Sequence, residues 1–317
     1  MSWYLARRCG QALVVVVGVM VLTFILIHLE PGSVARAQLG PRATAVRIAI
    51  FNRTYGLDKP VWFQFGAYVN QVAHGNLGTS FQLQQPVTTL IAQRLPKDVL
   101  LLGLSTALAL VIGLPMGVYQ AVRRNSVSDY ALSGVSFTFY SMPDFFFALM
   151  LIALFSVQLH VFPPVAPQAQ TVLGMLAEPR ALVLPVVTLA LVSVASYSRY
   201  MRSSAIDALA QDYIRVVRAK GLPERLVLSR HLLRNSLLPV ITIVGLSLPT
   251  IVAGAVIAEE VFNFPGMGLL FYQAAVSQDF PILLGSTLVV GVASVAGNLA
   301  ADIAYGVLDL RIRHVGG

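Results

Sequence analysis

Six long apolar stretches constrain this chain more than any other feature of its sequence. A helix needs about 20 consecutive apolar residues to cross the hydrocarbon core of a bilayer. Only 11% of the residues are charged, whereas soluble domains usually carry about 25%. The sequence therefore predicts an all-α, polytopic protein with about six transmembrane helices that contact the lipid bilayer. The predicted spans are 11–29, 99–121, 133–159, 181–198, 237–258 and 282–308.

The distribution of Lys and Arg predicts the orientation of these spans. Fourteen basic residues lie in the two tails and in the loops after the second and fourth spans, whereas Arg180 alone lies in the opposite short loops. Short cytoplasmic loops carry an excess of Lys and Arg, so both termini are expected in the cytoplasm. Because the basic residues flank apolar runs, the net charge of +8 does not indicate nucleic-acid binding.

The segment between the first two spans is expected to fold outside the membrane. Residues 61–69 have the pattern of a short amphipathic helix that ends before Gly75, and residues 43–51 are a second candidate. Pro86 is expected to open a helix over 87–95. The first span is interpreted as an uncleaved helix, although Arg7 and Arg8 before an apolar run also fit a cleaved signal peptide.

The loop 199–236 is the most polar stretch in the membrane-spanning half of the chain. Apolar residues recur at helical spacing up to Val217, Gly221 lies where a helix would stop, and Pro223 with Glu224 would start another. The pattern predicts a helix, a glycine break and a short basic helix before the fifth span. Such a unit can be a rigid projection that docks into another protein, or it can be a solvated loop that only determines the topology.

No catalytic or metal-binding motif is apparent in the sequence. A phosphate-binding P-loop needs a lysine directly after a glycine, and none of the three lysines follows one. The five histidines lack metal-ligand spacing, and Cys9 is the only cysteine. The chain is therefore not expected to be an enzyme or to bind a cofactor.

One acidic residue lies within a predicted span at a depth where charge is costly. Asp144 falls near the middle of the third span, beside Pro143. A carboxylate at this depth should face protein or a water-filled pathway. Asp144 is thus a candidate pathway-lining residue, and the alternative is a hydrogen-bonding partner at a proline kink.

Several segments resemble, in the same order, the dipeptide/oligopeptide/nickel family of ABC-importer permeases. The closest resemblance lies in 212–222 (DYIRVVRAKGL) and 230–240 (RHLLRNSLLPV), which are similar to the cytoplasmic coupling loop of that family. Further resemblances are 4–8, 55–60, 75–80, 260–268 and 309–313. The long outer segment resembles the first permease of the pair. Asn76, Ser33 and Leu310 depart from the family pattern, which leaves the substrate open.

The resemblance implies a type I ABC importer transmembrane fold in a bacterial inner or plasma membrane. It implies a first helix with an extracytoplasmic cap (1–95), a transmembrane domain (96–309) with the coupling loop 199–236, and a cytoplasmic tail (310–317). The implied partners are a sister permease in a heterodimer, two ATPase subunits that bind ATP and magnesium, and an extracytoplasmic substrate-binding protein. The implied ATPase-coupling residues are Arg215, Ala219, Lys220, Gly221, Leu222, Pro223, Glu224 and Arg225.

The function implied by the resemblance is that of a permease subunit for di- or oligopeptides. A permease for nickel chelates or other small solutes is the nearest alternative. An ion-coupled secondary transporter would need paired intramembrane charges and repeated halves, and no clear repeat is visible. An intramembrane enzyme would need a nucleophile with a base or a metal motif.

Overall fold

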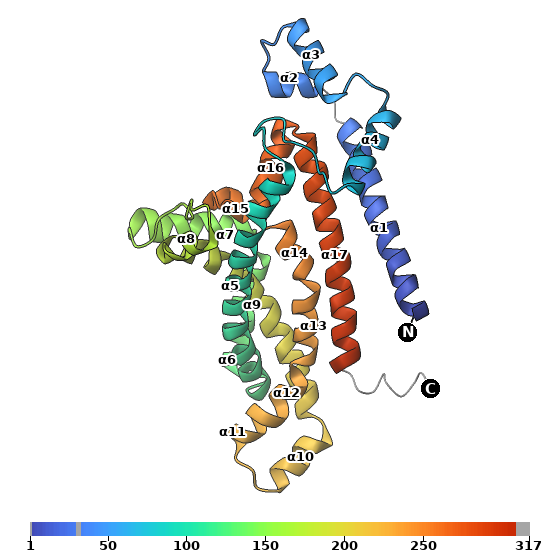
Figure 1. Ribbon diagram of the computed structural model, residues 1–317. Coiled ribbons are helices and arrows are strands. Elements are labelled where there is room, and N and C mark those ends of the chain that lie inside the picture. The colour runs from blue at the N-terminus through green and yellow to red at the C-terminus, as the bar shows by residue number, and fades with distance from the viewer. Residues whose placement is uncertain (1, 30–32, 309–317) are drawn as a thin grey trace. The chain divides into compact units, whose positions relative to one another are not determined.

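The computed structural model describes residues 2–29 and 33–308, and these residues form helices joined by loops and turns (Figure 1). The predicted tail 310–317 lies outside the described residues. The first helices are α1 (Ser2–Leu29), α2 (Val34–Leu39), α3 (Ala45–Tyr55), α4 (Val61–Ala73) and α5 (Val87–Val122). Then follow α6 (Val127–Ser141), α7 (Asp144–Leu151), the π-helix η1 (Ile152–Gln158), α8 (Val172–Leu176), α9 (Pro179–Leu209) and α10 (Asp212–Ala219). The last are α11 (Glu224–Leu226), the π-helix η2 (Val227–Leu232), α12 (Leu233–Ser236), α13 (Leu238–Leu246), α14 (Leu248–Ala253), α15 (Val256–Phe262), α16 (Met267–Ser277) and α17 (Phe280–Leu308).

Three of the predicted spans correspond to single long helices. Within the described residues, α5, α9 and the first 18 residues of α17 are long and apolar enough to cross a membrane. The apolar part of α1, Leu13–Leu29, is too short to count as a span by the same length criterion. Helix α5 begins at Val87 as predicted, but it continues through Pro96 without a break and absorbs the second span.

The third predicted span is bent sharply instead of running straight. Helix α6 ends at Ser141, α7 begins at Asp144, and the axes of the two helical parts differ by 103°. Pro143 explains the break, because a proline disfavours helical backbone in the residue before it, and Met142 is extended (φ −79°, ψ 136°). The described helices therefore offer three spans, or four if this bent pair is one span.

The fifth predicted span is divided into shorter helices. Helix α13 ends at Leu246, α14 ends at Ala253, and Gly254 has a positive φ of 79° before α15 begins. Only glycine adopts this backbone without strain. A continuous apolar run conceals such breaks, because hydropathy does not distinguish one long helix from several short ones.

The described chain divides into two compact units. Of the described residues, the first unit comprises 2–29, 33–98, 252–256 and 265–296, and the second comprises 99–251, 257–264 and 297–308. The first unit has a core of buried side chains from α1, α5, α16 and α17, including Phe24, Val87 and Met267. Within it, the Asp98 carboxylate accepts a 2.7 Å hydrogen bond from the backbone N–H of Met267. An acid at a helix start satisfies a free N–H and favours the helix dipole.

In the second unit α5 packs closely against α9 through two glycines. A Cβ on Gly117 would lie 2.5 Å from the Ser198 carbonyl oxygen and 2.7 Å from Met201 Cβ. A Cβ on Gly113 would lie 3.3 Å from Tyr197 Cβ. Small residues four positions apart let membrane helices approach this closely. This packing fixes α9, whose far end leads into α10.

Candidate functional site

The predicted coupling loop starts as a continuation of a long helix. Helix α9 runs on to Leu209, eleven residues beyond the predicted end of the fourth span at residue 198. Helix α10 follows after two residues, and α12 and α13 pack back against α9. The loop is therefore joined to the interior of the second unit by helix rather than by flexible chain.

Gly221 forms the predicted break between two helices. Ala219 is the last residue of α10, Lys220 caps it, and the Gly221 N–H donates a 2.9 Å hydrogen bond to the Arg218 carbonyl. Gly221 has φ +76°, the left-handed backbone that glycine adopts most easily. Pro223 then precedes α11, with Glu224 as the first helical residue. The predicted helix, glycine break and short helix are confirmed.

An apolar core holds the turn from one side. Ile214 of α10 and Val227 and Leu232 of η2 are fully buried. They pack with buried alanines of α5 and α9, and Leu222 lies partly buried against the same cluster. Because residues on both sides of Gly221 are packed, the turn is fixed to α9.

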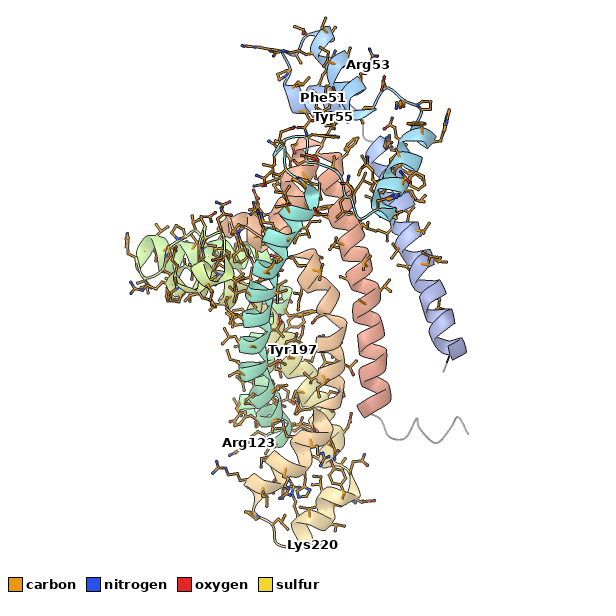
Figure 2. All side chains as sticks on the ribbon, in the orientation of Figure 1. Phe51, Arg53, Tyr55, Arg123, Tyr197 and Lys220 are labelled. Carbon is orange, nitrogen blue, oxygen red and sulfur yellow. The ribbon has the colours of Figure 1, made fainter. Side chains whose placement is uncertain are left out.

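The opposite side of the turn is exposed. Figure 2 shows Lys220 at one end of the second unit, whereas Tyr197 lies along α9. Of the predicted coupling residues, Leu222 is half-buried and the others are exposed, namely Arg215, Ala219, Lys220, Gly221, Pro223, Glu224 and Arg225. Arg215 pairs with Asp212 at 3.3 Å and Arg218 with Glu224 at 2.6 Å. The geometry thus provides a fixed, mostly basic projection.

The candidate pathway residue Asp144 lies at the proline bend, as its alternative interpretation expected. It is the first residue of α7, directly after the bend, and is half-buried. An acid in the first turn of a helix interacts favourably with the free N–H groups there. This position is compatible with a structural role for Asp144 at the bend, and its contact with cargo stays a prediction.

An ion pair that the sequence reasoning missed joins α6 to α9. Arg202 donates hydrogen bonds from Nε to Asp129 Oδ1 (2.8 Å) and from Nη2 to Oδ2 (2.7 Å). The Asp129 side chain is 1% exposed and also accepts from the Asn125 N–H at 3.0 Å. Ser126 caps α6 by accepting from the Asp129 N–H. The Ser-x-x-Asp spacing before an apolar run was the available signal of this helix start.

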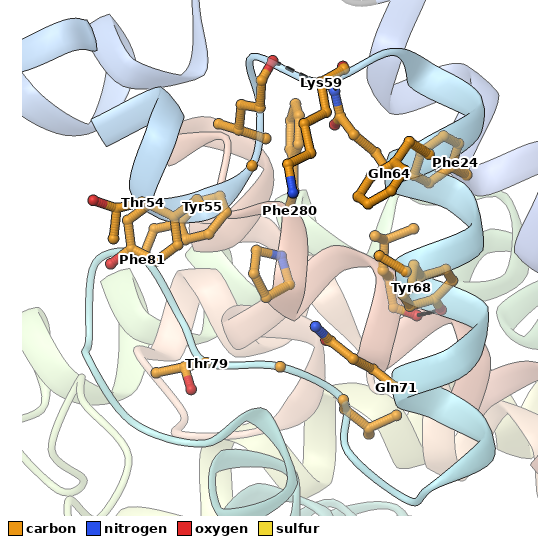
Figure 3. Close-up of a pocket in the computed structure, with 18 of the residues that line it drawn as sticks. Phe24, Thr54, Tyr55, Lys59, Gln64, Tyr68, Gln71, Thr79, Phe81 and Phe280 are labelled. Atoms are coloured by element: carbon orange, nitrogen blue, oxygen red, sulfur yellow. Dashed lines mark hydrogen bonds between the residues drawn. The ribbon is translucent and has the colours of Figure 1, made fainter. Parts of the chain in front are cut away.

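A half-open pocket lies within the first unit, between α1, α3, α4, the loop 76–81 and the start of α17 (Figure 3). Its volume is about 480 Å³, and aromatic side chains form much of its wall. His28 bonds to Gln64 at 3.1 Å, and the Lys59 ammonium lies 4.4 Å from the centre of the Phe63 ring. Burial raises the pKa of Tyr68 to about 12. The pocket can therefore make aromatic and cation–π contacts with a ligand.

No metal centre is present among the described side chains, since no group of three or more His, Cys, Asp or Glu is close enough to hold an ion. The candidate functional features of the described residues are a projecting turn, a buried ion pair and the pocket beside α4.

Two family matches cover most of the chain. Residues 113–314 match the family described as binding-protein-dependent transport system inner membrane component. Residues 1–102 match its N-terminal membrane component. The chain belongs to this family, and it is a multi-pass membrane permease subunit of the ABC importer class.

Relatives and a solved structure agree with this assignment. The chain is 38% identical to the oligopeptide transport system permease protein AppB of Bacillus subtilis, over 99% of this chain and 100% of that protein. It is 34% identical to the dipeptide transport system permease protein DppB of Escherichia coli, over 99% of each. A chain of the MetNI methionine ABC transporter superposes with a TM-score of 0.53 and 18% identity, covering 70% of this chain and 97% of that one. The type I importer fold is confirmed.

Proposed function

We propose that this chain forms half of the translocation pathway of an importer for di- or oligopeptides. The observation that carries the proposal is the full-length similarity to relatives named as oligopeptide and dipeptide permeases. Both relatives align over nearly their whole length, so the outer segment and the coupling loop are included in the match. The names of these relatives favour peptides over the alternative cargo, a nickel chelate or another small solute.

The partners follow from the same proposal. A sister permease would complete the pathway as a heterodimer, and an extracytoplasmic binding protein would deliver the peptide. Two ATPase subunits would bind ATP and magnesium in the cytoplasm, where both termini of this chain would also lie. This chain would bind no cofactor itself and would catalyse no reaction.

The turn at Gly221 is proposed as the docking element for one ATPase. Its exposed face is available to a partner, while Ile214, Val227 and Leu232 hold its other face against α9 and its neighbours. A displacement of the turn would therefore reach α9 instead of being absorbed by the loop. A conformational change of the ATPase is transmitted to this chain only if the ATP-bound and ATP-free forms of the ATPase fit the turn differently.

The test is transport by the reconstituted assembly. The tagged chain is co-expressed with its genomic neighbours, purified, and placed in vesicles that enclose ATP and magnesium on the ATPase side. Copurifying ATPases and ATP-dependent uptake of labelled di- or oligopeptides are expected. Uptake of nickel chelates but not peptides would favour the alternative cargo. Transport by the solitary chain, driven by an ion gradient without ATPases, would contradict the importer assignment.

A further inference from the structure

A small cavity in the second unit lies between α5, α6 and α9, and no step of the proposed transport cycle uses it. Its volume is about 280 Å³. The polar side chains that line it include Gln120, Ser133, Ser136, Arg199 and Arg202. Among the described residues that form its wall, none is acidic. The rest of the wall, including Phe137, Tyr140 and Ala195, is largely apolar. A cavity that combines a few polar groups with an apolar wall suits a ligand that has a polar head and an apolar part.

The cavity carries one positive charge that no lining acid balances. Arg202 is paired with Asp129 through two hydrogen bonds of 2.7 and 2.8 Å. Arg199 instead lies over aromatic rings, with its guanidinium carbon 5.0 Å from the centre of Tyr140 and 5.7 Å from that of Tyr200. A guanidinium offers a planar set of donors that suits phosphate or carboxylate oxygens. The expected ligand group is therefore an anion.

Two buried polar atoms in the wall have no hydrogen-bond partner among the described residues. Gln120 is 2% exposed, and its Nε2 donates to Ser133 Oγ at 3.1 Å, while its Oε1 has no partner among the described residues. The Ser136 hydroxyl is likewise buried and without a partner there. Leaving a buried polar group unpaired costs about 1–3 kcal/mol. A ligand with anionic oxygens and a hydroxyl would satisfy Ser136 and Gln120 together.

The surroundings of the cavity favour a lipid as the source of that ligand. Arg199 directly follows the predicted end of an apolar span, where basic and aromatic residues collect at a membrane surface. Helix α6 exposes large apolar side chains near the cavity, with Phe137 68% and Val135 51% exposed. Acyl chains could lie along this face while the head group enters the cavity.

We infer that this cavity binds the head group of an anionic phospholipid of the phosphatidylglycerol type. The phosphate oxygens accept hydrogen bonds from the Arg199 guanidinium and the Ser136 hydroxyl, and a head-group hydroxyl bonds to the Gln120 amide. The lipid then bridges α6 and α9 beside the Asp129–Arg202 pair. Because α9 leads into α10, the lipid stabilises the support of the coupling turn.

The test measures retained lipid on the full chain purified with its associated subunits. Native mass spectrometry is run after exchange into mixed micelles of phosphatidylglycerol and phosphatidylcholine. Wild-type protein is expected to retain phosphatidylglycerol selectively, and Arg199→Gln is expected to reduce that selectivity about tenfold, as loss of one charge-assisted contact would. Arg199→Lys, which keeps the charge, should lose less of the selectivity for phosphatidylglycerol.

Arg123→Gln is the matched control, because Arg123 is exposed at the end of α5 and does not line the cavity. It removes the same charge and should leave the retained lipid unchanged. Ser136→Ala provides a second, small change in case Arg199→Gln impairs assembly, and it too should lower selectivity. Equal retention in wild type, Arg199→Gln and Ser136→Ala would overturn the inference. Displacement of the lipid by a free dipeptide would also overturn it and would assign the cavity to cargo.

Discussion

Arg218 and Glu224 face each other across the turn at Gly221, with Arg218 Nη2 2.6 Å from Glu224 Oε1 and Nε 3.2 Å from Oε2. The pair closes the turn on its outer side. Both side chains are about half exposed, at 45% and 51%. Water therefore screens the attraction between them, and the backbone at Gly221 is expected to determine the shape of the turn.

Removing this ion pair should therefore have a small effect. Exposed pairs contribute about 0–1 kcal/mol, so Arg218→Gln should shift the thermal midpoint little and leave most substrate-stimulated ATP hydrolysis intact. Arg225→Ala, also at an exposed position, should be equally mild. Loss of ATPase binding in either variant, measured by copurification, would show that charge rather than shape governs docking.

The buried pair between Asp129 and Arg202 should matter more for stability. Asp129→Asn leaves the Arg202 guanidinium without its counter-charge and weakens two charge-assisted hydrogen bonds. Because Arg202 is 30% exposed, water offsets part of the loss, and a cost of about 2 kcal/mol is expected. The measurement is thermal unfolding of the purified chain in detergent.

Asp212→Asn is the matched control for that measurement. Asp212 pairs with Arg215 at 3.3 Å, but the two side chains are 91% and 74% exposed. The control should lower stability by less than about 0.5 kcal/mol. Equal effects of the two substitutions would mean that the Asp129–Arg202 pair does not hold α6 to α9.

Asp144→Asn tests the proposed contact with cargo or its water path. The amide keeps the size of the side chain and can still lie in the first turn of α7, so assembly and basal ATP hydrolysis should stay near normal. Peptide uptake in vesicles should fall. Unchanged uptake would leave Asp144 with only its structural role at the bend.

The predicted orientation places the first loop segment outside the cell. In a Cys9→Ala background, a cysteine at the exposed position Gln84 should react with an impermeant maleimide in intact cells. A cysteine at Val127, which is 87% exposed, should react only after permeabilisation. The reverse labelling pattern would invert the topology.

Local sequence signals predicted where helices end more reliably than hydropathy predicted whether an apolar run is one continuous helix. Gly75 and Gly221 were expected to end helices, and both have positive φ just after α4 and α10. Glycine and proline act on neighbouring backbone, so their effects can be read from short windows. The start of α5 after Pro86 was predictable for the same reason.

Features that depend on distant residues were not predictable in this way. The Asp129–Arg202 pair joins positions 73 apart in the chain, and nothing in either local window specifies the partner. The bend at Pro143 lies inside a continuous apolar run, and hydropathy alone favours one straight span there. The proline was the signal, but prolines also occur within intact membrane helices, as Pro185 does in α9.

The most direct test of the proposed coupling is the ratio of peptide transported to ATP hydrolysed in vesicles containing Gly221→Val. Gly221 has φ +76° and no atom within 4 Å of a built Cβ, so valine would strain the backbone without a steric clash. Gly75 has φ +75° and equally open surroundings, which makes Gly75→Val the matched control in the predicted outer segment. Gly221→Val is predicted to lose its ATPases or to hydrolyse ATP without uptake, while Gly75→Val keeps the wild-type ratio. A wild-type ratio in Gly221→Val, at normal subunit stoichiometry, would contradict the role of this turn in coupling.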